Sequence, residues 1–289
     1  MRECIIKGGF FHAGGRQNMR IVSLQPSITV TLSGLGVGQD IVGCTRRCRE
    51  LCPELATSAP RMVHDSWSAN SAEILETKPD LVIASVPYRM ESLAEILKTG
   101  VRVLTLAPST LDDVFGDIRT LAALVDRASA GEQMISRLQE ELEATRARTA
   151  EVPRQRVYCE AWGKPLMTSP QWVETLLESA GGEFVCRPNS QVTAEEVAAA
   201  DPEVILAAWC GLGNRTPLLE LLQRPGWMEL SAVREGRVYA VPDDWFNTPS
   251  LTLTMGLRAV RSALHPRAFW RPSEILDLQD LLPAEKRIG

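Results

Sequence analysis

The sequence has few of the residues, and none of the motifs, that usually mark an enzyme. It contains three histidines among 289 residues, and no GxSxG, P-loop, HExxH or strand-following GxGxxG motif occurs. His12 lies near the N-terminus and His265 precedes a proline, so a hydrolytic triad or a histidine-rich metal site is hard to assemble. We therefore predict a protein that is not an enzyme and that has no prosthetic group.

Long apolar runs are also missing. No stretch of about 18 apolar residues, the minimum for a membrane-spanning helix, occurs in the chain. The N-terminal apolar pieces Ile5-Ile6 and Phe10-Phe11 are too short for the continuous apolar region of a secretory signal. We expect residues 1–18 to be a disordered extension, with Met19 as a candidate start. The missing signal leaves a cytoplasmic location open.

No basic stripe is present. The formal net charge is −5, and acidic and basic residues are mixed along the chain. A nucleic-acid binder needs clustered lysines and arginines to contact phosphates. The charge pattern therefore argues against a nucleic-acid partner.

Seven cysteines, an odd number, weakly favour a reducing compartment over a fully paired disulfide framework. Cys44, Cys48 and Cys52 follow a CxxxCxxxC pattern. On a helix this spacing would place three thiols on one face, where they could hold a soft metal or an iron–sulfur cluster. The spacing differs from the usual CxxC pairs, so small core side chains are the favoured interpretation.

Short apolar runs alternate with helical patterns, which predicts βαβ units and parallel sheets. The alternation covers residues 19–111 and returns over 153–270, followed by a tail at 271–289. Between them, residues 112–152 have helical spacing and almost no strand signal, which predicts one or two long amphipathic helices. The expected fold class is α/β, with two similar lobes joined by a long helical segment.

The two halves share a local pattern. SAEILETKPDLVIAS (71–85) matches TAEEVAAADPEVILAAW (193–209) with a one-residue gap. Glu73 and Glu195 occupy corresponding places in the first turn of the two helices, where a cap or the helix dipole explains an acid. A symmetric pair of exposed acids could alternatively dock onto a two-fold partner through arginines.

Aromatic residues make up 6% of the chain, and tryptophan is the commonest of them. Four tryptophans lie in suspected loops or at a strand end: Trp67, Trp162, Trp209 and Trp245. Loops at the carboxyl ends of parallel strands are where α/β folds bind ligands, and indole rings there suit a flat, partly apolar ligand. Packing in a lobe core or in the seam between lobes is an equally good explanation for each of them taken singly.

Several segments together resemble the cobalamin- and siderophore-binding proteins of bacterial ABC importers. The resemblance rests on RIVSLQPSITVTLSGLG, IVGCT, DSWSANSAEILETKPDLVIAS, MTSPQWVETLLESAGGE and GRVYAVPDDWFNTPSL, and it covers about residues 19–265. It implies two Rossmann-like α/β lobes joined by one long rigid helix, with a ligand cleft between the lobes. It also implies a monomer that works outside the cytoplasmic membrane and delivers its ligand to the permease subunits.

The resemblance to the cobalamin-binding branch implies a set of cleft residues: Trp67, Tyr88, Trp162, Trp245, Phe246, Asp244 and Arg47. It also implies that Glu73 and Glu195 dock onto the permease. Where cobalamin binders often have a cleft tyrosine this chain has Arg47 or its neighbours, and Ser85 and Asn189 replace two further aromatics. The expected ligand is a corrinoid, with a ferric siderophore or haem as alternatives.

Two further expectations concern single residue types. Arg46, Arg47 and Arg49 would suit an anionic ligand. His64 could reach a cobalt or iron ion, although a loop histidine that faces water is the favoured interpretation.

A rival function from another class is a cytoplasmic metal or redox protein that uses the Cys44, Cys48 and Cys52 cluster.

Overall fold

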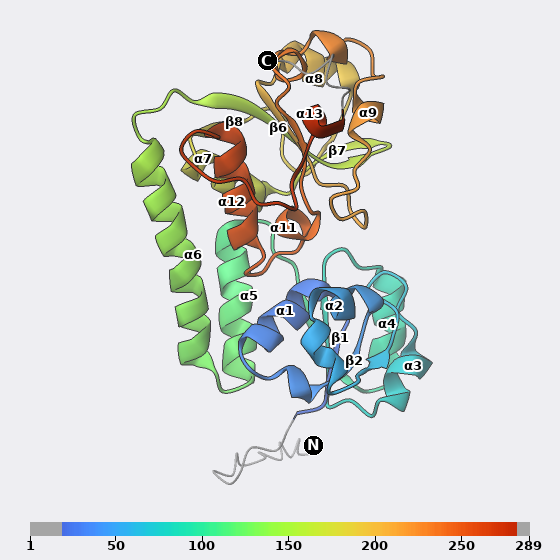
Figure 1. Cartoon of the computed structure of the whole chain (residues 1–289). Helices are drawn as coiled ribbons and strands as arrows, with labels where there is room; N and C mark the ends of the chain where they lie inside the picture. The colour runs from blue at the N-terminus through green and yellow to red at the C-terminus, as the bar shows by residue number, and fades with distance from the viewer. Residues whose placement is uncertain (1–18, 282–289) are drawn as a thin grey trace, which may run out of the picture.

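The structure, a computed structural model that describes residues 19–281, contains two separate β-sheets, each at the centre of one lobe (Figure 1). The lower lobe in Figure 1 is N-terminal and the upper lobe is C-terminal, and a pair of long helices runs beside both. The predicted α/β class with two lobes is confirmed. No helix among these residues is long and apolar enough to cross a membrane.

The N-terminal lobe is a five-stranded parallel sheet in the order β3-β2-β1-β4-β5. Its strands are β1 (Ile21–Ser23), β2 (Ile41–Cys44), β3 (Arg61–Met62), β4 (Leu81–Ser85) and β5 (Arg102–Leu106). Its helices are α1 (Pro26–Gly34), α2 (Arg46–Leu51), α3 (Ser71–Glu76) and α4 (Met90–Lys98). Every residue of β4 is buried, as its unbroken apolar run predicts for a central parallel strand.

The C-terminal lobe has a mixed sheet in the order β12-β11-β10-β6-β7-β9, with β8 also paired to β6. Its strands are β6 (Gln155–Gly163), β7 (Leu166–Thr168), β8 (Gly182–Phe184), β9 (Gln191–Val192), β10 (Val204–Ala207), β11 (Val238–Ala240) and β12 (Leu276–Asp277). Its helices are α7 (Gln171–Ser179), α8 (Ala194–Ala200), α9 (Leu218–Leu221), α10 (Ser231–Arg234), α11 (Asp244–Asn247), α12 (Leu253–Leu264) and α13 (Leu278–Leu281).

Two sequence expectations concern the ends of the chain. Part of the expected tail belongs to the C-terminal sheet, because β12 pairs antiparallel with β11. The expected extension at residues 1–18 lies outside the described residues. The predicted internal repeat is present, since α3 leads into β4 and α8 leads into β10, each a buried strand of a sheet centre.

The helical spacing allowed one or two long helices over 112–152, and the resemblance implied one; the structure has a hairpin of two, α5 (Leu111–Leu124) and α6 (Ala128–Thr149) (Figure 1). The chain reverses at Asp126, whose φ of 54° is left-handed and ends the first helix. Gly131 lets the helices approach closely, because a Cβ there would lie 2.5 Å from the Cβ of Ala122. Helical spacing alone does not reveal this break, since apolar residues continue on both sides of it.

This helix pair contributes to the cores of both lobes. Val114, Ile118 and Leu138 pack in the core cluster of the C-terminal lobe. Leu121 and Met134 pack in the cluster that contains the first strands of the N-terminal lobe. Because the same two helices are buried in both cores, the lobes cannot move far apart without exposing apolar surface.

We expect Gly256→Ala to destabilise the fold although alanine is the better helix former. In α12 the added Cβ would meet the Trp245 carbonyl oxygen at 2.4 Å, so α11 and α12 must move apart. Overpacking of this kind costs about 1–3 kcal/mol. The matched control is Gly116→Ala in α5, where a Cβ meets nothing within 4 Å, and which should gain up to about 1 kcal/mol. Denaturant unfolding measures both, and a more stable Gly256→Ala protein would contradict this packing.

Candidate functional site

A cavity of about 520 Å³ lies between the two lobes at the carboxyl ends of parallel strands. The N-terminal lobe lines it with the segments that follow β1, β2, β3 and β4. The C-terminal lobe lines it with the segments that follow β10 and β11, with Asn247 at the end of α11 and with the next two residues, Thr248 and Pro249. This is the position where α/β sheets bind ligands, and the volume is in the usual range for small-molecule sites.

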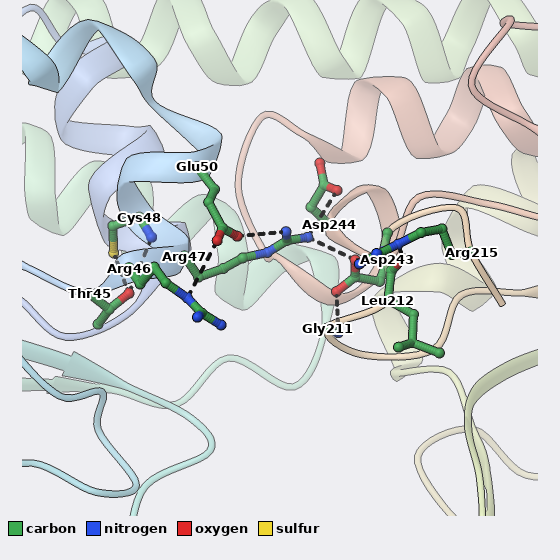
Figure 2. A network of polar contacts seen from close by, with 11 residues as sticks. Thr45, Arg46, Arg47, Cys48, Glu50, Gly211, Leu212, Arg215, Asp243 and Asp244 are labelled. Atoms are coloured by element: carbon green, nitrogen blue, oxygen red, sulfur yellow. Dashed lines mark hydrogen bonds and ion pairs between the residues drawn. The ribbon is translucent and has the colours of Figure 1, made fainter.

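Arg47 crosses the cavity from the N-terminal lobe to the C-terminal lobe (Figure 2). Its Nη2 donates to Oδ1 of Asp243 at 2.8 Å and lies 3.5 Å from Oδ1 of Asp244. Its Nη1 donates to Oε2 of Glu50 in its own lobe at 3.2 Å. Burial opposes the charge of Arg47, but the acids around it prevail and raise the pKa of the guanidinium. This ion pair is a direct polar link between the lobes.

The buried Asp243 carboxylate is the centre of this link (Figure 2). Its Oδ2 accepts a hydrogen bond from the Gly211 amide at 2.8 Å, and its Oδ1 accepts one from the Gly213 amide at 2.9 Å. Both glycines have positive φ, 81° and 61°, a conformation that glycine adopts without steric cost. The loop after β10 therefore binds the same carboxylate that pairs with Arg47.

A second buried carboxylate anchors the start of that loop. Glu160 on β6 is fully buried and accepts two hydrogen bonds from Arg224, at 2.6 and 2.9 Å. It also accepts from Trp209 Nε1 at 2.7 Å and from the Tyr158 hydroxyl at 2.8 Å. A buried carboxylate with this many hydrogen-bond partners is difficult to move, because the loss of any partner leaves part of its charge unpaired in the protein interior. Trp209, which precedes the loop, is thereby held inside the lobe.

The charges that line the cavity are nearly balanced. Arg46 and Arg47 face Glu50, Asp65 and Asp243. Arg47 is engaged by acids, and Arg46 Nε lies 3.5 Å from Glu50. An anionic ligand would therefore have to compete with carboxylates for both arginines, and Arg49 is not among the lining residues.

His64 lines the cavity and contacts the predicted docking acid. Its Nδ1 lies 2.8 Å from Oε2 of Glu73, and its backbone amide lies 3.4 Å from the same oxygen. The hydrogen bond and the charge of Glu73 raise the pKa of His64, and the hydrogen bond from His64 lowers the pKa of Glu73.

Neither Glu73 nor Glu195 caps its helix, although both lie in the first helical turn, where the helix dipole favours an acid. Asn70 caps α3 by accepting from the Ala72 amide, while the Glu73 carboxylate binds His64. In α8 the capping box is formed by Thr193 and Glu196, which leaves Glu195 exposed.

The predicted ligand-binding residues are placed in different surroundings. Arg47 lines the cavity, and Asp244 lies beside it within 3.5 Å of the guanidinium. Trp245 and Phe246 are buried in the core of the C-terminal lobe, where Trp172 Nε1 donates to the Phe246 carbonyl at 2.6 Å. The side chains after Asp244 turn inward because α11 packs against α12 at the close contact with Gly256.

The other predicted aromatics lie outside the cavity lining. Trp67 and Trp162 are exposed by 53% and 43%, and Trp162 Nε1 donates to the nearby Lys164 carbonyl at 2.8 Å. Tyr88 is half-buried against the apolar cluster of the N-terminal lobe. No tryptophan, tyrosine or phenylalanine of residues 19–281 is among the residues that line this cavity.

The three cysteines do not share one helix face. Cys44 ends β2, Cys48 lies in α2 and Cys52 follows that helix, and all three thiols are buried and free. They belong to the apolar core of the N-terminal lobe. Burial raises the pKa of Cys52 to about 11, which keeps it protonated. Within the described residues no group of three or more His, Cys, Asp or Glu side chains could hold a metal ion. The interpretation as small core side chains therefore fits the structure.

Sequence reasoning missed most of the lining residues: Gln25, Pro26, Ser27, Thr45, Glu50, Val63, Asp65, Ser68, Val86, Pro87, Cys210, Gly211, Asp243, Asn247, Thr248 and Pro249. A usable signal existed, because most of them directly follow a predicted parallel strand. From the sequence we looked for tryptophans in the loops that follow parallel strands and did not consider most of the small and polar residues in the same loops.

The family model described as "Periplasmic binding protein" matches residues 21–245 of the chain. The vitamin B12-binding protein of Vibrio cholerae is 27% identical over 240 residues, which cover 80% of this chain and 83% of that protein.

Solved structures show the same fold. The periplasmic heme-binding protein RhuT from Roseiflexus sp. RS-1 superposes with a TM-score of 0.74 at 26% identity, covering 86% of this chain and 98% of that one. A periplasmic heme-binding protein from Pseudomonas aeruginosa superposes with a TM-score of 0.78 at 21% identity, covering 90% of this chain and 97% of that one. The family resemblance inferred from the sequence is confirmed.

We expect Asp243→Asn to destabilise the protein, because the neutral amide loses the ion pair with Arg47 and leaves one of the two glycine amides facing an NH₂ group. The cost should be about 1–3 kcal/mol in the free energy of unfolding. The matched control is Asp244→Asn, whose contact with Arg47 is 3.5 Å and which should cost less than about 1 kcal/mol. Equal effects of the two substitutions in denaturant unfolding would show that Asp243 is not the central residue.

Proposed function

The chain belongs to the periplasmic binding protein family, and on that basis we propose that it is the solute-binding component of an ABC importer, with a corrinoid as its solute. The observation that carries the proposal is the cavity of about 520 Å³ between two lobes held together by a helix pair and an ion pair. A preformed cleft of this kind can bind a bulky, rigid chelate without a large conformational change.

The chemistry of the lining supports a largely neutral solute. Arg46 and Arg47 are already paired with Glu50 and Asp243, so few free positive charges remain for an anionic ligand. Gln25, Ser68 and Asn247 add uncharged polar groups, and Val63 and Val86 add apolar surface. A corrinoid carries many neutral amides around a flat, partly apolar ring, which matches this mixture. Haem and most ferric siderophores bring anionic groups that would compete with Glu50 and Asp243 for the arginines.

The names of the relatives support a tetrapyrrole-type metal chelate as the solute. The Vibrio cholerae relative is named as a vitamin B12-binding protein, whereas two structural neighbours are named as heme-binding proteins. A relative in Bacillus subtilis, 21% identical over 267 residues, is named as a substrate-binding lipoprotein of an ABC transporter. The three relatives whose names give a ligand thus bind vitamin B12 or heme, both of which are metal chelates.

Docking onto the permease is assigned to one acid of each lobe. Glu195 is exposed in the first turn of α8 and takes no part in its capping box, so its carboxylate is available to an arginine. Glu73 uses Oε2 for both of its contacts with His64, which leaves Oε1 for a second partner. The protein would act as a monomer on the outer side of the cytoplasmic membrane.

Calorimetric titration of the purified protein tests the solute. We expect cyanocobalamin or cobinamide to bind with a Kd of about 1 µM or tighter, and hemin and a ferric siderophore to bind more weakly. The expected order follows from the paired arginines of the cavity. Tighter binding of hemin than of either corrinoid would move the assignment to haem. Absence of heat with all four ligands would overturn the proposal.

Glu195→Ala tests docking. The substitution should leave the affinity for the solute unchanged. It should reduce solute-stimulated ATP hydrolysis by the reconstituted importer by about tenfold or more, because an arginine–carboxylate pair worth about 1.4 kcal/mol or more is lost at the interface with the permease. The control is Glu220→Ala, an exposed acid on α9 of the same lobe. Equal ATPase stimulation by both variants would remove Glu195 from the docking surface.

A further inference from the structure

The side chain of His64 is held in one orientation by Glu73, which a loop histidine that only faces water does not need. His64 is one of the residues that line the interlobe cavity, and its Nδ1 lies 2.8 Å from the carboxylate of Glu73 on the next helix. The same carboxylate oxygen lies 3.4 Å from the His64 backbone amide, so the ring and the main chain are both tied to α3. The imidazole is therefore oriented, although its side chain is 58% exposed.

The segment that carries His64 is also fixed. Oδ1 of Asp65 accepts from the backbone amides of Trp67 and Ser68, at 3.1 and 2.9 Å, and from the Ser68 hydroxyl at 2.7 Å. Asp65 is thus occupied by the turn and does not compete for the imidazole. The turn presents His64 on the cavity wall between β3 and α3.

A carboxylate on one ring nitrogen determines what the other nitrogen can do. With the proton held on Nδ1 toward Glu73, the lone pair of the neutral ring lies on Nε2. Nε2 has no hydrogen-bond partner among residues 19–281. Histidines that bind metals almost always donate their other N–H to a carboxylate or a carbonyl in this way, which fixes the tautomer and raises the basicity of the metal-binding nitrogen.

We propose that His64 binds the metal of the chelate through Nε2 as an axial ligand, with Glu73 as its positioning residue. This inference rests on the proposed function and deepens it. In the step, Nε2 donates its lone pair to the cobalt, one bound water leaves the metal, and the oxidation state does not change. Chelates that have an exchangeable axial position then gain this additional bond, and chelates without one bind through the rest of the cavity alone.

The selection has a chemical consequence that separates two corrinoids. Aquacobinamide carries exchangeable water on cobalt, whereas both axial positions of dicyanocobinamide are occupied by cyanide. The two probes share the same ring and the same amide groups. His64 should therefore contribute to the binding of the first and not to that of the second.

The test is a visible-absorption titration of the whole protein with both corrinoids, for the wild type and for His64→Gln. Glutamine preserves a hydrogen-bonding group toward Glu73 but has no imidazole nitrogen. We expect the wild type to shift the spectrum of aquacobinamide toward that of its imidazole complex. In His64→Gln the shift should vanish and the affinity should fall about tenfold or more. The affinity for dicyanocobinamide should be the same in both proteins.

Two further variants make the result specific. His265→Gln removes the other described histidine, which lies in the C-terminal lobe with Nε2 2.7 Å from the Ala180 carbonyl, and it should leave the spectral shift intact. Glu73→Gln should keep the shift but weaken aquacobinamide binding several-fold, because the ligand remains while its orientation is lost. An unchanged aquacobinamide affinity in Glu73→Gln would overturn the positioning role.

The outcomes separate this inference from the function on which it rests. If both corrinoids bind but His64→Gln changes neither the spectrum nor the affinity ratio, His64 is not a ligand and the corrinoid-binding function stands. If His64→Gln weakens both corrinoids equally, the residue contributes to the cavity wall and not to the metal. If neither corrinoid binds the wild type, the proposed solute and the axial ligation are both overturned.

Discussion

The Asp243 carboxylate is the interaction on which the candidate site depends. It is buried, it accepts hydrogen bonds from the Gly211 and Gly213 amides, and it pairs with Arg47 of the opposite lobe. Each of these partners stabilises the negative charge that burial opposes. This one side chain therefore helps to fix the conformation of the loop, the position of Arg47 and the distance between the lobes. Behind it, the fully buried Glu160 secures Trp209 and with it the start of the same loop.

The α5–α6 helix pair supplies the frame for this polar link. Its upper residues are buried with the C-terminal lobe and its lower residues with the N-terminal lobe, so one helical hairpin is shared by two cores (Figure 1). Apolar burial resists separation of the lobes, and the ion pair resists their displacement across the cavity. A cleft that is held open in this way can bind a rigid solute at little cost in conformational freedom.

The lining of the cavity explains how a site without aromatic walls can still be selective. The balanced charges of Arg46, Arg47, Glu50 and Asp243 disfavour ligands that bring strong charge of one sign, since such a ligand leaves an acid or an arginine unpaired. The proposed axial ligation by His64 would add a different kind of discrimination, at the metal of the chelate and not at its periphery. Its contact with Glu73 connects a residue of the cavity lining to an acid that we propose docks onto the permease.

The sequence by itself determined the α/β alternation, the repeated helix–strand unit and the family, because these depend on local periodicity and on motifs in fixed order. The tertiary structure decided which side chains face the cavity. Asp243 and Asp244 are adjacent in the chain, yet only Asp243 binds the glycine loop, and Trp245 turns into the core because α11 packs on α12. It also decided that Glu73 binds a histidine nine residues away instead of capping its helix, and that the chain reverses at Asp126. Periodicity reports whether a residue is buried or exposed, but the direction of a side chain relative to a second lobe is set by contacts between distant segments, which no local pattern contains.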